Sequence, residues 1–379
     1  MKILYFSPIY WNDLKQRPQH LAEEFAKMPG VHITFVEPSI SILNSIVRQN
    51  SDYKRRNQII NDSLQIFRPS GSLRLPRSFE RLDIFHLNQW FEKRQLKDLV
   101  CSADIIWLGS PVFYPLIKSN NKKKKIVFDR MDDYVFLTNN ALMKKLLEKW
   151  ELELLAKADL VISTSNHLHK HSQTLCRQSY LVKNAVDTAI LNINVDSLVA
   201  DELRRLKQEG YYIFGYVGAI DHWFDVEAVK AITDFDEKFV VCLVGRNNLN
   251  YNFEQHNRIK YYETVPKSEI GAIIDAFDIC LYPFLRNSDR IDTINPVKVY
   301  EYLSFNKVIL AVDSEETRLL NQEGIYLYHS LEEIRKYLMD IDTLQRPFYD
   351  QEQLENFVVH NNWEARAKTI MELLIKELQ

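Results

Sequence analysis

The sequence predicts an α/β protein built from two doubly wound domains, and three observations support this prediction. Short apolar runs alternate with amphipathic segments of helical period, which is the pattern of strands joined through helices. The pattern ends and restarts near residues 187–210. The chain has 379 residues, 46% of them apolar, which is enough for two domains of ordinary size. We therefore expect an N-terminal domain over residues 1–190 and a C-terminal domain over residues 191–360.

Seven apolar runs predict the strands of the N-terminal domain: 2–9, 32–38, 64–69, 104–111, 125–131, 160–165 and 180–186. Amphipathic segments such as "PQHLAEEFAKM" (18–28) and "NNALMKKLLEKWELELLAKA" (139–158) predict helices between them. Because strands joined through helices run in the same direction, we expect a mostly parallel sheet.

Five further runs predict the strands of the C-terminal domain: 211–220, 238–246, 259–265, 279–284 and 307–312. Residues 361–379 predict a final helix, which we expect to pack back on the N-terminal domain. In doubly wound sheets, ligands bind beyond the carboxyl ends of the strands. Two such domains would face each other across a cleft, so residues that directly follow strands are the first candidates for a site.

Composition excludes several classes of protein. No apolar run approaches the roughly 18 residues of a membrane span. The N-terminal "MKILYFSPIYW" lacks the pattern of a signal peptide. No two of the four cysteines have metal-ligand spacing, so we expect no zinc site. Cys242 and Cys280 lie in apolar runs and are expected to be buried thiols of a reducing, cytoplasmic compartment.

The net charge of −3 conceals an asymmetry between the two halves. Residues 1–190 carry 28 Lys and Arg against 19 Asp and Glu, and the remainder carries 20 against 32. A basic half predicts an anionic partner, for which nucleic acid, anionic lipid and a phosphorylated substrate all qualify. No nucleic-acid-binding signature is present, so we expect no nucleic acid. The "SPIYWND" after the first strand lacks the glycines of a dinucleotide oxidoreductase.

The stretch "NPVKVYEYL" (295–303) has the residues of an anion site. Asn295 and Pro296 predict the start of a helix, whose N-terminus favours negative charge. Lys298 in the first turn opposes the helix dipole unless an anion, such as a diphosphate, neutralises both. Glu301 lies one turn later on the same face and can accept hydrogen bonds from ribose hydroxyls. The alternative is an exposed Lys–Glu pair on a surface helix.

An ordered set of motifs gives the chain a family resemblance. "NPVKVYEYLSFNKVILA" (295–311) resembles the donor-binding motif of GT-B glycosyltransferases of the family-four type. Other segments match this family in place: "DAFDICLYPF" (275–284), "GYVGAIDHWFD" (215–225), "LVGR" (243–246) and "LVKNAVD" (181–187). In the first domain, "RPQHLAEEFAK" (17–27) and "FDRMDDY" (128–134) are similar to a subgroup from capsule and teichuronic-acid gene clusters.

The resemblance implies the GT-B fold and transfer of a sugar from a nucleotide diphosphate, most often UDP, to a glycan or lipid-linked acceptor. It implies retention of configuration, no metal ion and no other cofactor. The Glu at position 301 would bind ribose, and Lys298 would bind the diphosphate. The donor-binding set that it implies is Gly218, Arg246, Thr264, Val265, Arg290, Thr293, Asn295, Pro296, Val297, Lys298 and Glu301.

The sequence departs from the family at two places. Thr293 stands where the family often has a second Glu, so the usual contact to the transferred sugar is absent or is replaced by backbone N–H groups of residues 293–295. His222 and Trp223 stand where many relatives carry a basic residue that binds phosphate. Arg290 and Arg246 are the residues that could supply the missing charge, and the alternative for both is a solvated surface position.

Polar residues that follow strands of the first domain are the acceptor-side candidates. Asp132 or Asp133 could bind an acceptor hydroxyl or act as a base, although Asp133 could instead cap the following helix. Arg17, Gln19 and His20 are expected at the cleft edge, where His20 could be a base or a sugar contact. Capping and hydrogen bonding are the alternative for these three. The catalytic candidates are therefore Asp132, Asp133, His20 and Lys298.

Basic segments of the first domain predict contact with an anionic membrane at the inner face of the cell membrane. They are "NNKKKKI" (120–126) and Lys54, Arg55, Arg56, Arg68, Arg74, Arg77 and Arg81. Each basic residue near such a surface contributes about 1 kcal/mol. Nearby aromatic residues could form an amphipathic patch, namely Phe79, Phe85, Trp90 and Phe91. The alternative for the Lys run is a solvated turn.

Two other functions remain open at this point. Non-hydrolysing sugar-nucleotide epimerases share the architecture, need no acceptor and release no nucleotide in net turnover. A degenerate GT-B subunit would bind or scaffold without catalysis, and the absence of the second Glu keeps this possibility open.

Overall fold

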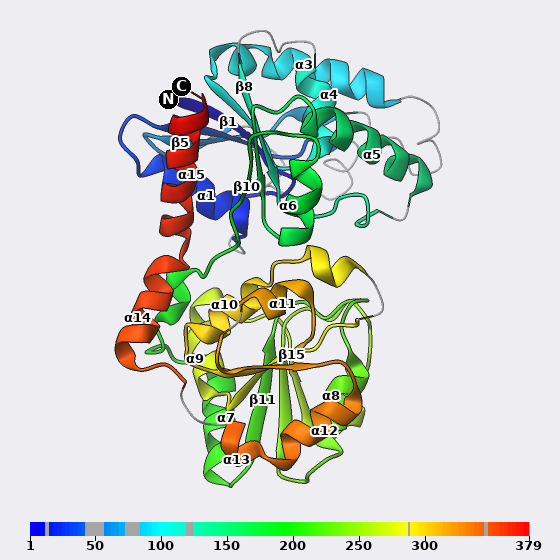
Figure 1. Cartoon of the computed structure of the whole chain (residues 1–379), viewed down its shortest axis with the longest axis vertical. Coiled ribbons are helices and arrows are strands. Elements are labelled where there is room, and N and C mark those ends of the chain that lie inside the picture. The colour runs from blue at the N-terminus through cyan, green and yellow to red at the C-terminus, as the bar shows by residue number, and fades with distance from the viewer. Residues whose placement is uncertain are drawn as a thin grey trace. The chain divides into compact units, whose positions relative to one another are not determined.

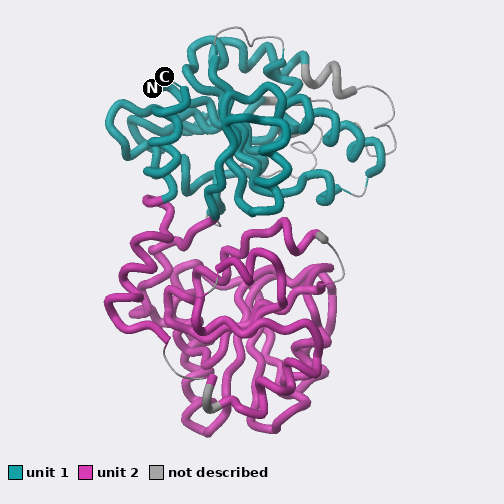
Figure 2. Tube along the Cα trace, in the orientation of Figure 1, with its two compact units in different colours: residues 1–183, 366–379 teal, residues 184–365 magenta. Residues whose placement is uncertain are grey.

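The computed structural model describes residues 1–11, 15–41, 57–72, 84–118, 124–138, 140–286, 289–320, 322–344 and 348–378. The chain forms two units, shown in separate colours in Figure 2. Unit 1 comprises Met1–Lys183 and Arg366–Gln379, and unit 2 comprises Asn184–Ala365. The boundary therefore lies seven residues before the position that the sequence indicated, and the last residues of the chain return to unit 1.

Unit 1 is built on an eight-stranded sheet with the order β10-β9-β8-β7-β1-β2-β5-β4. Its strands are β1 (Lys2–Phe6), β2 (His32–Val36), β4 (Asn57–Asn61), β5 (Leu64–Phe67), β7 (Ile105–Leu108), β8 (Lys125–Arg130), β9 (Leu160–Ser163) and β10 (Ser179–Leu181). Neighbouring strands are parallel except β4 and β5. Each of the seven predicted runs overlaps a strand. The edge strand β4 was not predicted because its sequence, "NQIIN", is exposed throughout and has no apolar alternation.

A separate two-stranded pairing joins β3 (Ile40–Ser41) and β6 (Ser70–Ser72). The helices of unit 1 are α1 (Arg17–Ala26), α3 (Ile84–Ser102), α4 (Tyr114–Ile117), α5 (Ala141–Leu155), α6 (Asn166–Gln173) and most of α15 (Trp363–Leu378), with a 3-10 turn at Pro111–Phe113. Side chains of Asn140 and Ser165 accept hydrogen bonds from the first turns of α5 and α6 and so fix where these helices begin.

The C-terminal helix α15 is tied to unit 1 by polar contacts. The Tyr180 hydroxyl donates to Glu377 at 2.6 Å, and Arg366 Nε donates to the Lys183 carbonyl at 3.2 Å. None of the described helices combines the length and the apolar character needed to cross a membrane.

Unit 2 is built on a six-stranded parallel sheet with the order β13-β12-β11-β14-β15-β16. Its strands are β11 (Tyr212–Val217), β12 (Phe239–Val244), β13 (Ile259–Tyr262), β14 (Ile279–Tyr282), β15 (Val308–Val312) and β16 (Ile325–Tyr328). The first five match the predicted runs. The edge strand β16 was not predicted, and only one of its four residues is buried. Cys242 and Cys280 are buried thiols on β12 and β14, as predicted.

The helices of unit 2 are α7 (Leu198–Gln208), α8 (Val226–Thr233), α9 (Ile270–Ala276), α10 (Val297–Leu303), α11 (Glu315–Leu320), α12 (Leu331–Met339), α13 (Ile341–Leu344) and α14 (Gln351–His360). Short 3-10 turns lie at Thr188–Leu191, Phe253–Gln255, Lys267–Glu269 and Asp289–Thr293. Figure 1 shows α10 and α11 at one end of the unit and α13 at the other.

Each sheet has one point where the strand order reverses. In unit 1 the chain runs outward from β1 through β2 on one side and from β7 through β8 on the other. In unit 2 the same reversal lies between β11 and β14. Loops that leave such neighbouring strands in opposite directions open a crevice at their carboxyl ends, where ligands of doubly wound sheets bind. The residues that follow β11 and β14 are therefore the first place to look for a site in unit 2.

Candidate functional site

Two glycine-containing loops touch each other at the carboxyl edge of the unit 2 sheet. The Gly218 amide, directly after β11, donates to the Val244 carbonyl at 2.8 Å. Gly245, directly after β12, has a φ of +139°, and a Cβ at this residue would lie 2.1 Å from the Gly218 carbonyl oxygen. Both its backbone conformation and this close approach require glycine at position 245. The result is a flat stretch of main chain at the edge of the sheet.

Lys298 lies against this stretch. A Cβ on Gly218 would be 3.3 Å from Lys298 Cε and 2.7 Å from the Tyr216 hydroxyl, so the absence of a side chain at position 218 makes room for the lysine. Lys298 Nζ donates to Glu301 Oε2 at 3.0 Å. The Lys298 side chain is 28% exposed and the Glu301 side chain 12% exposed. Lys298 is therefore partly exposed and Glu301 mostly buried, and both remain within reach of a ligand.

One tyrosine joins α10 to β11, and a second holds the loop that follows β11. The Val217 amide donates to the Tyr302 hydroxyl at 3.1 Å, which joins the helix to the last residue of the strand. The Tyr216 hydroxyl donates to the Ala219 carbonyl at 2.9 Å. Burial raises the pKa of Tyr216, and the nearby negative charge of Glu301 raises it further. Lys298 and Glu301 are therefore held on a rigid element at the switch point of the sheet.

The predicted N-cap of this helix is wrong by one residue. Pro296 occupies the N-cap position, and no side chain caps the helix. The buried Asn295 side chain instead donates to Glu316 Oε2 at 2.9 Å and accepts from the Asn184 amide at 2.8 Å. An amide buried this deeply needs partners for both its nitrogen and its oxygen. The two partners named lie outside the helix, and the same nitrogen also donates to the Tyr300 hydroxyl of α10 at 3.3 Å. Because α10 has only seven residues, we attribute the positive charge of this edge to Lys298 rather than to a helix dipole.

Arg290 belongs to the 3-10 turn Asp289–Thr293 and contacts the loop that follows Gly218. Its guanidinium stacks over the Trp223 ring at 5.2 Å, and Nη1 lies 2.9 Å from His222 Nε2. The loop after Gly218 has no basic residue of its own, but Arg290 lies next to it in the structure. The Thr293 hydroxyl donates to the Arg290 carbonyl at 2.8 Å, so this buried threonine shapes the turn that carries the arginine.

The remaining donor-side residues follow the neighbouring strands. Arg246 is exposed and comes two residues after β12. Thr264 is exposed, and Val265 is partly buried against the core; both follow β13. Their roles in binding a base or a phosphate stay predictions.

Two of the three acceptor-side predictions for α1 need correction. Arg17 is 4% exposed and donates through Nε to both oxygens of Asp129, at 3.0 and 3.1 Å. Gln19 is fully buried, completes a capping box with Gln16 and donates to the Tyr10 carbonyl at 3.0 Å. Both side chains are used inside the fold, so we assign them to the framework around the loop after β1. His20 is 7% exposed, and its role stays a prediction.

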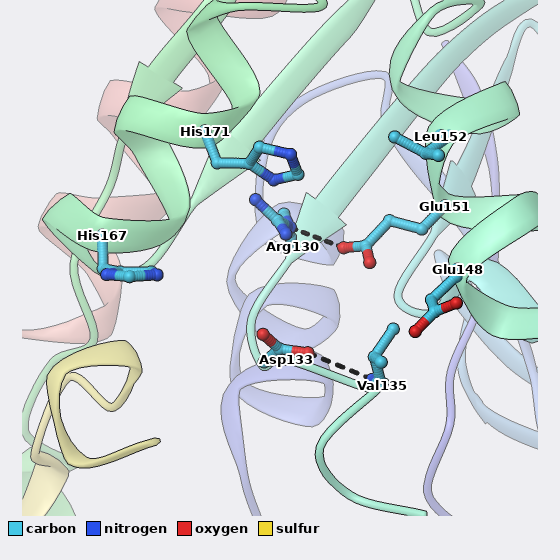
Figure 3. A pocket seen from close by; sticks show the side chains of 8 residues that line it. All are labelled: Arg130, Asp133, Val135, Glu148, Glu151, Leu152, His167 and His171. Carbon is cyan, nitrogen blue, oxygen red and sulfur yellow. Dashed lines mark hydrogen bonds and ion pairs between the residues drawn. The ribbon is translucent and has the colours of Figure 1, made fainter. Parts of the chain in front are cut away.

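Asp133 lies in a pocket of about 390 Å³ inside unit 1, shown in Figure 3. The pocket is lined by Arg130, Asp133, Val135, Glu148, Glu151, Leu152, His167 and His171. Asp133 Oδ1 accepts from the amides of Val135 and Phe136 at 3.1 and 3.3 Å, and so caps the turn after β8. The helix that follows is capped by Asn140 instead. Asp132 is not part of the lining.

A buried ion pair forms the floor of this pocket. Arg130 Nε donates to Glu151 Oε1 at 2.6 Å, and Arg130 Nη1 donates to the Leu168 carbonyl at 2.8 Å. Burial raises the pKa of Glu151, and the Arg130 charge opposes this rise. Burial and the Arg130 charge lower the pKa of His171. The arrangement combines one fixed cation, several carboxylates and a neutral imidazole.

Sequence reasoning missed most of this lining. One signal could have found it, because Glu148, Glu151 and Leu152 share one face of α5 and His167 and His171 share one face of α6. That α5 and α6 meet at the end of β8 is a property of the fold. Among the described residues, no group of three or more His, Cys, Asp or Glu is arranged to hold a metal ion.

Comparison with known proteins identifies the fold. No family model matches the sequence. TuaH of Bacillus subtilis, a candidate glycosyltransferase of teichuronic acid biosynthesis, is 21% identical over 238 residues. That match covers 59% of each chain, so it spans about three fifths of the relative's length.

Two solved structures are similar over nearly the whole chain. Sucrose-phosphate synthase of Thermosynechococcus elongatus has a TM-score of 0.73 at 13% identity, with 99% of this chain and 98% of that chain covered. HepE of Anabaena, solved with UDP-glucose, has a TM-score of 0.69 at 13% identity, with 99% and 100% covered. At this identity the likeness establishes the fold, which is the predicted GT-B fold of two doubly wound units.

Proposed function

We propose that the protein is a glycosyltransferase that takes a sugar from a nucleotide diphosphate donor, with UDP as the nucleotide. The observation that carries this proposal is the Lys298–Glu301 pair beside Gly218 at the switch point of the unit 2 sheet. A cation and a carboxylate held 3.0 Å apart beside bare main chain suit a diphosphate and its ribose. We also propose that the enzyme is of the family-four type.

Binding of the donor would replace the internal ion pair with one ion pair to the diphosphate and with hydrogen bonds to the ribose. Lys298 would turn from Glu301 to the diphosphate oxygens, which are stronger and more highly charged partners. Glu301 would then accept hydrogen bonds from the two ribose hydroxyls. The bare main chain at Gly218 would let the phosphates approach closely. Arg290, held by Trp223 and His222, would add a second positive charge.

The same cations would assist the chemistry. When the bond between the anomeric carbon and the diphosphate breaks, negative charge develops on the leaving oxygen. Lys298 and Arg290 would stabilise this charge more in the transition state than in the ground state. We propose attack by the acceptor hydroxyl on the same face of the sugar, with retention and without a metal ion. Asp132, Asp133 and His20 are the candidates for the group that accepts the proton.

The similar proteins support the proposed UDP-sugar donor and the proposed role in polysaccharide synthesis. HepE is solved with UDP-glucose and with UDP, and these structures cover at least 99% of this chain. The likeness to TuaH supports a role in cell-surface polysaccharide synthesis, with a glycan or lipid-linked acceptor. We propose that the enzyme works in the cytoplasm, at the inner face of the membrane.

Exposed aromatic residues of α3 support the proposed membrane contact. Trp90 and Phe91 are 54% and 44% exposed, and the Arg94 guanidinium lies 5.8 Å from the Trp90 ring. Arg68 instead pairs with the buried Glu37 and is used within unit 1. The other basic residues of the 54–81 segment, with Phe79 and the side chain of Phe85, lie outside the described residues.

Release of nucleotide from a UDP-sugar tests the proposal. The protein should release UDP slowly by donor hydrolysis and faster when an acceptor is present. Lys298→Ala should abolish both, and Lys230→Ala is a matched control. Lys230 also donates to a glutamate three residues away at 3.0 Å and is 29% exposed, but it lies on α8. A protein that interconverts UDP-sugars without net UDP release would be an epimerase, and one that shows neither activity would be a binding subunit.

A further inference from the structure

The pocket of unit 1 has the dimensions of a small-ligand site. It lies where β8 ends, between the faces of α5 and α6, and its volume of about 390 Å³ falls within the range of roughly 300–1,000 Å³ for such sites. All of its lining residues belong to unit 1. Its contents can therefore be inferred without reference to the donor site of unit 2.

A buried donor is available to a ligand in this pocket. Arg130 is 3% exposed, and its Nε and Nη1 are occupied by Glu151, Leu168 and Ser172. Within the described part of the chain, Nη2 makes no hydrogen bond, although the residue lines the pocket. Figure 3 shows the guanidinium between His171 and Glu151. This nitrogen is open to the pocket rather than enclosed by protein, so it can donate to a ligand oxygen.

Acceptors face the same space. Asp133 uses Oδ1 to cap the turn at Val135, and its Oδ2 makes no hydrogen bond to any described residue. Glu148 is exposed at the rim on α5. Neighbouring ring hydroxyls can donate to a carboxylate and accept from a guanidinium at once. Leu152 and Val135 supply apolar surface for the C–H face of a ring.

The charge of the pocket selects among sugars. Three carboxylates face one guanidinium, namely Asp133, Glu148 and Glu151 against Arg130. Burial and the Arg130 charge lower the pKa of His171, so this imidazole adds no positive charge at neutral pH. A net negative pocket repels a phosphate or a uronate carboxylate and favours a neutral or positively charged ring.

We propose that this pocket binds one sugar residue that is neutral or carries an amino group, and that this residue is the terminus of the acceptor. Binding of the sugar does not depend on the proposed function; its description as the acceptor does. Any anionic group of the acceptor would then lie outside this pocket.

Ligand-observed saturation-transfer NMR on the full chain tests the proposal. The probes are glucose, glucosamine and glucuronate, titrated into the wild type, Asp133→Asn, Glu148→Gln and Glu153→Gln. The amide of Asp133→Asn can still cap the turn, so the variant should fold. Glu153 is a matched control because it lies on α5 but pairs with Lys118 outside the pocket.

We expect glucosamine and glucose to bind, with glucuronate at least tenfold weaker. Asp133→Asn should weaken the binding of glucosamine about tenfold, as the loss of one charged hydrogen bond does. Glu148→Gln should weaken this binding less, and Glu153→Gln should leave it unchanged. The proposal would be overturned by equal or tighter binding of glucuronate, by an unchanged affinity in Asp133→Asn, or by the absence of a saturation-transfer signal from every sugar.

A UDP titration of the same samples separates this inference from the proposed function. If UDP binds but no sugar does, the pocket assignment fails and the transferase proposal stands. If the sugars bind as expected but UDP does not, the pocket is a carbohydrate site and the transferase proposal fails.

Discussion

Lys298 Nζ lies 3.0 Å from Glu301 Oε2, one helical turn apart at the carboxyl edge of a parallel sheet. In a protein that binds nothing at this edge, such a pair would contribute little, because a partly exposed ion pair is worth about 0–1 kcal/mol. Because the pair lies beside Gly218, we interpret it as a pair that binds a ligand, and the first predictions test this interpretation.

Replacing Lys298 with Ala should lower kcat/KM for the donor roughly a hundredfold or more, as the loss of one group that stabilises a leaving oxygen does. The melting temperature should change by no more than a few degrees, since the pair is partly exposed. Initial rates of UDP release and a melting curve measure the two effects. Lys230→Ala should change neither, and an equal loss of rate in both variants would contradict the role of Lys298.

Replacing Glu301 with Gln should weaken discrimination between ribose and deoxyribose. The wild type should bind UDP about tenfold more tightly than 2′-deoxy-UDP, because one hydrogen bond to a carboxylate is lost. In Glu301→Gln this ratio should fall, because the neutral amide oxygen accepts a weaker hydrogen bond than the carboxylate. Calorimetric titration of both nucleotides gives the ratio directly, and an unchanged ratio in the variant would place the ribose elsewhere.

A methyl group at position 218 should interfere with the donor more than with the fold. In Gly218→Ala the new Cβ would meet the Tyr216 hydroxyl at 2.7 Å and Lys298 Cε at 3.3 Å. Overpacking of this kind costs about 1–3 kcal/mol. Tyr216→Phe in the same chain should restore part of the stability but not UDP affinity, because Lys298 stays displaced. Recovery of both would show that only the tyrosine clash mattered.

The buried Arg17–Asp129 pair should matter for stability rather than for substrate. Arg17→Ala leaves the fully buried Asp129 carboxylate without its guanidinium. Removing one partner of a buried pair costs about 3–5 kcal/mol, so the unfolding midpoint in urea should fall clearly. If instead stability held while acceptor KM rose, the assignment of Arg17 to the framework would be wrong.

Stability should fall on mild acidification, and His171 should contribute to the fall. Burial and Arg130 lower the pKa of His171 below its ordinary value of 6.5. The folded state then binds fewer protons than the unfolded state, so stability is lost as pH falls through 6.5. Glu151 acts with the opposite sign, because its raised pKa favours the folded state at lower pH. Between pH 7.5 and pH 5.5, the melting temperature of His171→Gln should fall less than that of the wild type. An equal fall in both proteins would contradict the role of His171.

Particular residues show which features of the structure could be predicted from the sequence. Apolar runs located the inner strands of both sheets because burial on both faces leaves a continuous apolar signature. The exposed edge strand β4 and the only partly buried edge strand β16 are not covered on both faces. Lys298 and Glu301 could be found because their spacing and chemistry are local to one helix. The role of Asn295 could not, since its partners Asn184 and Glu316 are remote in the sequence.

The same reason explains why the acceptor-side residues could not be assigned from the sequence. Arg17 looked like a polar residue at the start of a surface helix, and only the fold brings it to Asp129 across 112 residues. The pocket at Asp133 joins residues of α5 and α6 that no local pattern connects. Spacing along one element can be read from a sequence, whereas burial and pairing between elements depend on the tertiary fold.

Thermal melting with nucleotides tests the central claim most directly. UDP at about 100 times its Kd should stabilise the wild type by roughly 2.7 kcal/mol and raise the melting temperature by a few degrees. The account predicts that this rise disappears in Lys298→Ala and in Glu301→Ala and persists in Lys230→Ala. A rise that survives in both site variants, or no rise with UDP, GDP or ADP in the wild type, would contradict it.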